Sequence, residues 1–170
     1  EAYDKMYERN YFGMMMVERG DADAFITGLY TKYSNTIKVA TEVVGVREGY
    51  HTFGTMHIVN SQKGTFYIAD TLINRHPDNN YLVDIARLSA NTVEFFNEKP
   101  VMAMISYSNF GTDEIGSPLK VHEAVEELHA NYPNLIVDGE MQVNFALNRE
   151  MRDEKYPFSK LKDKDVNTLV

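Results

Sequence analysis

Strand-like apolar segments alternate with amphipathic helical segments along this chain of 170 residues. Because parallel strands are joined by helical crossovers, such alternation is typical of a mostly parallel sheet with helices on both faces. The sequence therefore predicts an α/β fold with three αβα layers. The expected strands cover residues 24–27, 55–60, 65–69, 101–106, 134–141 and 166–170, and the expected helices cover 3–20, 34–45, 77–96, 117–132 and 142–151.

Residues with specific backbone preferences mark the expected element boundaries. Gly20 and Gly45 follow the first two helices and can adopt the left-handed conformation that ends a helix. Asp78 is the expected N-cap of the third helix. Ser117, which is followed by proline, is the expected cap of the fourth. The short connection 61–64 between two strands predicts a hairpin.

The chain has 25 acidic and 17 basic residues, which gives a formal charge of −8. Sequence-independent binding of nucleic acid needs a basic surface, so no nucleic-acid partner is expected. An anionic ligand would have to be held by local Lys, Arg and backbone N–H groups. The absence of cysteine excludes disulfides, thiolate zinc sites and a cysteine nucleophile. No apolar run reaches the length of a membrane span, so no membrane partner is expected.

Both ends of the sequence resemble internal positions of a longer protein. The chain begins at Glu1 without an initiator methionine and ends in the strand-like run DVNTLV. We therefore expect residues 1–170 to form a single α/β lobe that is a fragment of a larger domain. The N-terminal segment has no signal-peptide pattern, which favours a cytoplasmic location.

The most distinctive segment is VMAMISYSNFGT, where a buried strand ends in small polar residues and a glycine shortly before a helix. Ligands of parallel α/β sheets bind outside the carboxyl ends of the strands. Backbone N–H groups of such a loop can turn inward and form an anion-binding concavity, and the helix N-terminus adds donors. The alternative is an ordinary loop stabilised by serine and asparagine turns.

Other segments that follow expected strands have weaker signals. Lys38, near a helix start, could meet a phosphate as a point charge, or could simply be solvated. Turn formation explains most polar residues after the second hairpin strand, where Arg75 is the obvious anion binder. Asp138 and Glu140 could do acid–base chemistry or bind Mg²⁺; alternatively, Asp138 caps the next helix and Gly139 makes a tight turn. The histidines fit no metal-ligand pattern, and no P-loop, GxGxxG or nucleophile elbow is present.

Five motifs occur in the order RNYFGMMMVERGDADAFITG, NTIKVATEVVG, FYIADTLINRHP, PVMAMISYSNFGT and LIVDGEMQVNFAL. Through these motifs, nearly the whole chain resembles the phosphotransacetylase (phosphate acetyl/butyryl transferase) family. The resemblance implies a two-lobed α/β enzyme of isocitrate/isopropylmalate dehydrogenase-like architecture, a cleft that binds coenzyme A and phosphate, and a homodimer. It also implies that the catalytic aspartate and its Ser-Arg partners lie outside this chain, so no catalytic residue is assigned.

The sequence departs from the active enzymes of that family at three positions. Those enzymes usually have a basic residue where Phe110 stands, arginine where Lys38 stands, and frequently cysteine where Thr71 stands. The motifs SNFG and DGEMQ instead resemble the phosphotransacetylase-like C-terminal domain of bacterial NADP-dependent malic enzymes. That resemblance implies a sensor domain in which acetyl-CoA binding inhibits malate oxidation, and which helps to build the oligomer.

The leading hypothesis is a non-catalytic regulatory domain of an NADP-dependent malic enzyme. NADP and a divalent metal (Mg or Mn) are expected only in the region that oxidises malate to pyruvate, and no cofactor is expected in this segment. The alternatives are an active phosphate acetyltransferase, which moves acetyl between coenzyme A and phosphate, and a purely structural dimerisation module. The residues expected to bind acetyl-CoA or phosphate are Ser106, Ser108, Asn109 and Gly111, with Thr36 and Lys38 facing them.

Overall fold

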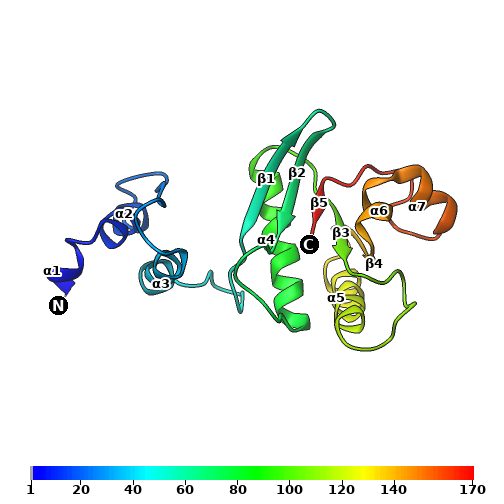
Figure 1. Cartoon of the computed structure of the whole chain (residues 1–170), viewed down its shortest axis with the longest axis horizontal. Coiled ribbons are helices and arrows are strands. Elements are labelled where there is room, and N and C mark those ends of the chain that lie inside the picture. Colours follow the sequence, from blue (N-terminus) through cyan, green and yellow to red (C-terminus); the bar gives the residue numbers. More distant parts are fainter. Residues whose placement is uncertain (1) are drawn as a thin grey trace. The chain divides into compact units, whose positions relative to one another are not determined.

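The computed structural model describes residues 2–170 and contains two compact units, Glu1–Gly49 and Tyr50–Val170. Figure 1 labels their elements. The first unit contains α1 (Ala2–Lys5), α2 (Arg9–Glu18) and α3 (Tyr33–Val43). The second contains, in chain order, β1 (Met56–Ser61), β2 (Gly64–Ala69), α4 (Asn79–Phe95), β3 (Val101–Ile105), α5 (Ser117–Asn131), β4 (Ile136–Met141), α6 (Val143–Leu147), α7 (Arg149–Lys155) and β5 (Thr168–Leu169).

Glycines end the two longer helices of the N-terminal unit, as expected. Gly20 has φ +77°, and its N–H donates to the carbonyl of Val17 at 3.0 Å, while the N–H of Asp21 reaches the carbonyl of Met16 at 2.8 Å. This pair of bonds satisfies two of the carbonyls that a helix C-terminus leaves free. The helix expected over 3–20 is nevertheless divided, because α1 ends at Lys5 and α2 begins at Arg9.

The strand expected over residues 24–27 is absent, and this prediction was wrong. The segment has no ladder partner among residues 2–170, so side chains hold it in place. The ring of Phe25 lies directly against Gly13 of α2, where any larger residue would collide with it. The hydroxyl of Thr27 donates to Oδ1 of the buried Asn10 at 2.7 Å. Ile26, between them, is 96% exposed, unlike a residue of a covered sheet.

The second unit is built on a five-stranded sheet in the order β1-β2-β5-β3-β4. β1 and β2 form the expected antiparallel hairpin, closed by a two-residue turn between Ser61 and Gly64. The other three pairs of neighbouring strands are parallel. The prediction of an α/β fold with a mostly parallel sheet is therefore confirmed.

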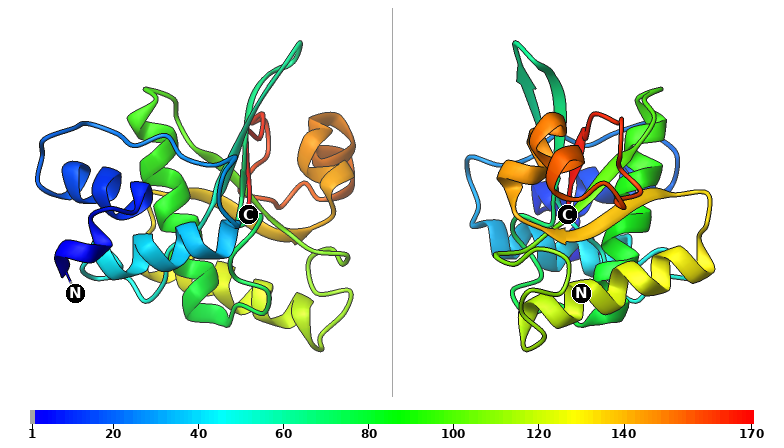
Figure 2. Two further views of the ribbon diagram at one scale, coloured as in Figure 1. Left: turned by 60° about the vertical axis from the view of Figure 1, so that its left-hand side comes forward. Right: turned by 90° about the vertical axis from the view of Figure 1, so that its right-hand side faces the viewer.

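Alternating side chains of β3 build the cores on the two faces of this sheet. Met102 and Met104 pack with α4 and α5 on one face. Ala103 points to the other face, where it packs with Ala146 of α6 and with Leu161. Figure 2 shows α5 and the pair α6–α7 on opposite sides of β4. This alternation follows from the two-residue period of a strand and produces three layers.

The structure refines the expected helix starts in the second unit. Asp78 caps α4 as expected, because its side chain accepts a hydrogen bond from the N–H of Tyr81 at 2.9 Å. The cap of α5 is Gly116 (φ +68°), so Ser117 is the first helical residue, not the cap. The single helix expected over 142–151 is divided at Asn148, which has extended backbone angles and caps α7.

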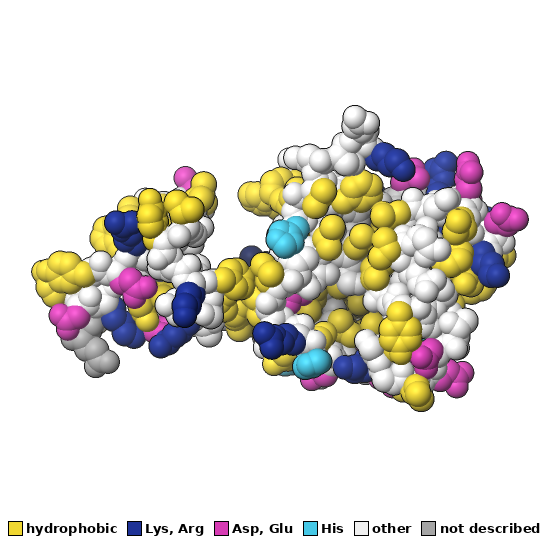
Figure 3. All heavy atoms as spheres, viewed as in Figure 1, with side chains coloured by type: hydrophobic (Ala, Val, Ile, Leu, Met, Phe, Trp, Pro, Cys, Tyr) yellow, Lys and Arg dark blue, Asp and Glu magenta, His cyan; other side chains and the backbone are white. Residues whose placement is uncertain are grey.

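Strand β1 is the least covered strand of the sheet. Five of its six residues are exposed, including Ile58 and Val59. Figure 3 shows apolar side chains gathered over this part of the second unit. No helix within residues 2–170 is both long enough and apolar enough to cross a membrane.

Candidate functional site: the loop after strand β3

The loop between β3 and α5 has its inward N–H groups occupied by the protein itself. The N–H of Gly111 donates to Oε1 of Glu140 at 2.7 Å, and the N–H of Phe110 donates to the carbonyl of Glu140 at 2.8 Å. The N–H of Asn109 donates to Oγ1 of Thr112 at 3.1 Å. These three N–H groups therefore have acceptors within the protein: a carboxylate, a backbone carbonyl and a hydroxyl.

Glu140 organises this loop from the end of β4. Its side chain is fully buried, and Oε1 also accepts a hydrogen bond from the Ser108 hydroxyl at 3.3 Å. Its second oxygen, Oε2, has no hydrogen-bond partner among the described residues, and Nδ1 of His122 lies 3.5 Å from it. Sequence reasoning identified Glu140 only as a possible acid, base or metal ligand. Its contacts show a group that fixes the loop conformation.

Asn109 joins the loop to the start of α6. Its Nδ2 donates to Oε1 of Gln142 at 3.0 Å, and the N–H of Gln142 donates to Asn109 Oδ1 at 2.8 Å. Nε2 of Gln142 also reaches the carbonyl of Tyr107 at 2.8 Å. Sequence reasoning missed Gln142, although its place directly after a buried strand was a signal for such a role.

Ser106 differs from its neighbours in having an unused hydroxyl. Its N–H donates to the carbonyl of Met141 at 3.0 Å, but its Oγ is buried and has no hydrogen-bond partner within residues 2–170. Ser108, in contrast, is bonded to Thr112 at 2.8 Å as well as to Glu140. Buried polar atoms are normally hydrogen-bonded. Of the four predicted loop residues, Ser106 is therefore the one whose side chain a ligand could still satisfy.

Phe110 makes one side of the loop aromatic. Its ring centroid lies 4.8 Å from that of Tyr156 and 5.1 Å from that of Phe158. Phenylalanine at φ +46° is an uncommon conformation, and the aromatic contacts together with the Glu140 hydrogen bond hold it there. The aromatic cluster presents apolar surface at this point of the loop.

Asp138 and Gly139 have roles that the sequence analysis did not assign. Asp138 lies within β4 and is buried, and its Oδ2 accepts hydrogen bonds from the Ser159 hydroxyl at 2.7 Å and the Lys160 N–H at 2.8 Å. It therefore holds the segment after α7 and does not cap a helix. Gly139 is a strand residue and not a turn residue. Within the described residues, no cluster of three or more His, Asp or Glu side chains is arranged to hold a metal ion.

Thr36 and Lys38 belong to the N-terminal unit. Oγ1 of Thr36 lies 3.2 Å from that of Thr31, and Nζ of Lys38 lies 3.8 Å from Oε1 of Glu42. Hydrogen bonds from Tyr11 and Lys5 lower the pKa of Glu42, which keeps a negative charge beside Lys38. The side chain of Lys38 is mostly exposed. The expectation that Thr36 and Lys38 face the loop stays a prediction.

Asp70 holds the polar segment that follows β2 through hydrogen bonds to its carboxylate. Its carboxylate accepts hydrogen bonds from the Thr55 hydroxyl, from the Thr55 N–H at 3.0 Å and from the Asn74 N–H at 2.7 Å. Burial alone would raise the pKa of Asp70, but these bonds together outweigh it and lower the pKa from 3.8 to about 2. Turn formation therefore accounts for the polar residues of this segment, as the sequence predicted for most of them.

Comparisons with known proteins identify the family to which this chain belongs. The model of the family described as phosphate acetyl/butaryl transferase matches residues 1–170. An NADP-dependent malic enzyme of Escherichia coli is 39% identical over 158 residues, which are 93% of this chain and 21% of that protein. A phosphate acetyltransferase of Bacillus subtilis is 32% identical over the whole chain, which covers 52% of that protein.

The fold comparison agrees with the sequence comparisons. The crystal structure of a phosphotransacetylase from Streptococcus pyogenes superposes with a TM-score of 0.85 and 31% identity, covering 95% of this chain and 49% of that one. The chain thus spans about half of the acetyltransferases and about a fifth of the malic enzyme. Because the family model matches its full length, this chain belongs to the phosphate acetyl/butaryl transferase family.

Proposed function

We propose that the chain is part of a regulatory and oligomerisation domain of an NADP-dependent malic enzyme, and that it binds acetyl-CoA without transferring the acetyl group. The loop after β3 is the binding rim, formed by Ser106, Ser108, Asn109 and Gly111, with Thr36 and Lys38 assigned to the same ligand. NADP and the divalent metal belong to the malate-oxidising region of such a protein. Self-association and a cytoplasmic location are parts of the same proposal.

The observation that supports a binding role most strongly is the environment of Phe110. Transfer of acetyl between coenzyme A and phosphate needs a group that exchanges a proton with the coenzyme A sulfur, and cations for the charge on the phosphate oxygens. The Phe110 ring packs against Tyr156 and Phe158, and it stands where the family resemblance leads us to expect a basic residue. Binding needs only hydrogen-bond donors and apolar surface, and this loop has a free hydroxyl and an aromatic cluster.

The internal bonds of the loop support the same proposal. Glu140 takes the N–H of Gly111, and Asn109 and Gln142 bond to each other. The loop is therefore held in one conformation before any ligand arrives, which reduces the entropy lost on binding. A pre-organised loop can recognise a ligand without supplying reactive groups.

The alternative function is an active phosphate acetyltransferase. It is favoured by the 32% identity to the Bacillus subtilis enzyme, which extends over all 170 residues. In this reaction, the phosphate oxygen attacks the thioester carbonyl, the C–S bond breaks, and coenzyme A leaves as the thiolate, which then takes a proton. The reaction therefore releases one free thiol for each acetyl group transferred.

A thiol-release assay on the full-length protein separates the two functions. With acetyl-CoA and inorganic phosphate, we expect no thiol above the rate of uncatalysed hydrolysis. Calorimetric titration of the same sample should still show saturable binding of acetyl-CoA. Phosphate-dependent thiol release with ordinary enzymatic turnover would overturn the regulatory proposal. Failure of acetyl-CoA to bind would instead favour a purely structural module.

A further inference from the structure

A small cavity lies at the opposite end of the parallel strands from the loop after β3. Its volume is about 220 Å³. It lies between the β1–β2 turn, the α6–α7 pair and the segment that leads into β5, and its lining includes Lys63, Thr65, Arg149, Arg152, Asp165 and Asn167. Thr65 opens β2 and Asn167 directly precedes β5, so the cavity is at the amino ends of these strands. The loop after β3 is at the carboxyl ends.

The lining of this cavity is basic, although the chain as a whole has a formal charge of −8. Three cationic side chains contribute to it, against the carboxylate of Asp165 in the lining and that of Asp153, which pairs with Arg152. Arg149 and Asp165 form an exposed ion pair with 3.1 Å between Nη1 and Oδ2. Exposed pairs of this kind are weak and exchange partners readily. Arg149 can therefore turn to an anion in the cavity at little cost.

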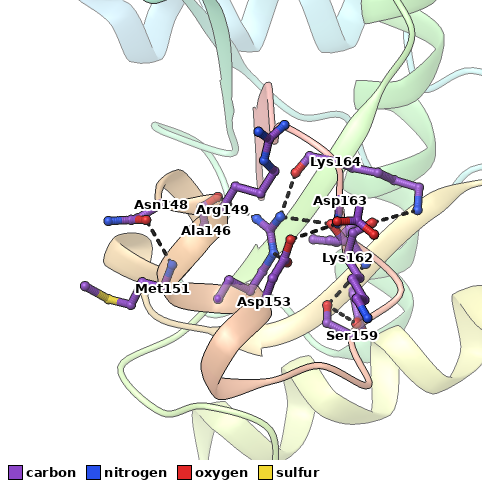
Figure 4. Close-up of polar contacts among 12 residues, drawn as sticks. Ala146, Asn148, Arg149, Met151, Asp153, Ser159, Lys162, Asp163 and Lys164 are labelled. Atoms are coloured by element: carbon purple, nitrogen blue, oxygen red, sulfur yellow. Dashed lines mark hydrogen bonds and ion pairs between the residues drawn. The ribbon is translucent and has the colours of Figure 1, made fainter.

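Arg152 supplies a rigid, buried positive charge. Its side chain is fully buried, and its Nη groups donate to the carbonyls of Ala146 at 3.1 Å, Leu161 at 2.9 Å and Lys164 at 2.6 Å. Figure 4 shows polar contacts of the α6–α7 region and the following segment, with Ala146, Asp153 and Lys164 labelled. Nε lies 3.3 Å from Oδ1 of Asp153 but makes no hydrogen bond within residues 2–170. Asp153 pairs with this charge, so Arg152 mainly holds the segment after α7 in place beside the cavity.

Lys63 adds a charge from the hairpin turn. It is exposed, and its backbone N–H is fixed by the Ser61 hydroxyl at 3.1 Å. Its ammonium forms no ion pair with any residue in the described part of the chain. An unpaired ammonium at the cavity rim can approach a ligand from solvent.

We propose that this cavity binds a phosphate group, either free or as the terminal group of a small molecule. The guanidinium fork of Arg149 and the ammonium group of Lys63 match the geometry and charge of phosphate oxygens. The cavity is smaller than the clefts that enclose drug-sized ligands, so only a compact anion fits within it. The site is separate from the acetyl-CoA rim, so this proposal does not depend on the proposed function.

The test is an NMR titration of the ¹⁵N-labelled chain with inorganic phosphate at low ionic strength, where screening is weak. We expect saturable shifts at Lys63, Thr65 and Arg149. The Lys63→Glu variant should weaken binding at least tenfold. Lys162→Glu is the matched control, because Lys162 is exposed, lies outside the cavity lining and changes the net charge equally. Its affinity should stay within twofold of the wild type.

A second titration with a phosphate monoester, glycerol 2-phosphate, identifies the source of the group. Tighter binding of the monoester than of inorganic phosphate supports a small organic phosphate, and the reverse order supports free phosphate. The proposal is overturned if neither compound gives saturable shifts at the cavity residues. It is also overturned if Lys63→Glu and Lys162→Glu bind phosphate equally well.

Discussion

Glu140 is the residue on which the candidate site depends most. It is fully buried, and it bonds to Gly111 and Ser108 through one carboxylate oxygen and to Phe110 through its carbonyl. The sequence placed a carboxylate after a buried strand but could not show that the loop after β3 would close around it. That contact joins residues 29 positions apart. Local spacing predicts which residues follow a strand, not which loop they meet.

Replacing Glu140 with alanine should loosen this loop and lower the stability of the chain. The N–H of Gly111 and the Ser108 hydroxyl would each lose an acceptor, and a lost hydrogen bond typically costs about 0.5–1.5 kcal/mol. Urea denaturation measures the free energy of unfolding. Glu126→Ala is the matched control, because Glu126 is exposed on α5. Equal stability of the two variants would show that Glu140 does not hold the loop.

Asp70 should make the stability of the chain fall in acid. Its pKa is lower in the folded state, about 2, than the ordinary value of 3.8. The carboxylate therefore stabilises the fold above about pH 4, and this contribution is lost as the pH falls through about 2. Urea unfolding of the wild type and of Asp70→Asn across this range measures the effect. Parallel pH dependences of the two proteins would contradict the assignment.

The pairing of β3 with β4 positions the loop and Glu140 relative to each other. The two strands run parallel, and Met104 is opposite Gly139 before the register shifts at Ile105 and Met141. Gly139 has φ +152°, and a Cβ added there would lie 2.5 Å from the carbonyl oxygen of Met104. Only glycine permits this approach of two backbones. The irregularity at the end of β4 therefore depends on one residue type.

Gly139→Ala should destabilise the sheet more than a comparable change elsewhere. Gly64→Ala is the matched control, because Gly64 also has a positive φ, +124°, but has open space around its Cα. The difference between the two variants isolates the collision with Met104, which we expect to cost about 1–3 kcal/mol beyond the shared backbone strain. Urea denaturation of both variants measures it. A smaller loss for Gly139→Ala would contradict the contact.

Elements with a strong periodic pattern were predictable, and elements that depend on tertiary partners were not. The hairpin, α4 with its Asp78 cap and the buried strand β3 follow directly from apolar period and capping chemistry. Residues 24–27 have the composition of a strand, but the described residues 2–170 offer no neighbouring strand to bond with. The break between α6 and α7 also escaped prediction, because Asn148 continues the apparent pattern while its backbone is extended.

At the scale of the whole molecule, the chain combines the fold of the phosphate acetyl/butaryl transferase family with a loop after β3 that is held by internal hydrogen bonds. The sequence predicted the family and the mostly parallel sheet. It did not predict that the loop's N–H groups are bonded internally, because those bonds come from Glu140 and Thr112. Within residues 2–170, the group of this loop that is left for a ligand is therefore the unbonded hydroxyl of Ser106, and not the backbone N–H groups.

The most direct test is the rate of malate oxidation by the full-length protein, measured against acetyl-CoA concentration. Ser106→Ala removes an unbonded hydroxyl, and Ser117→Ala is the control, since Ser117 is exposed at the start of α5. The account predicts that acetyl-CoA inhibits the wild type and Ser117→Ala alike. Ser106→Ala should need about 3- to 10-fold more ligand, the equivalent of one hydrogen bond. No response of the wild type, or an unchanged response of Ser106→Ala, would contradict the account.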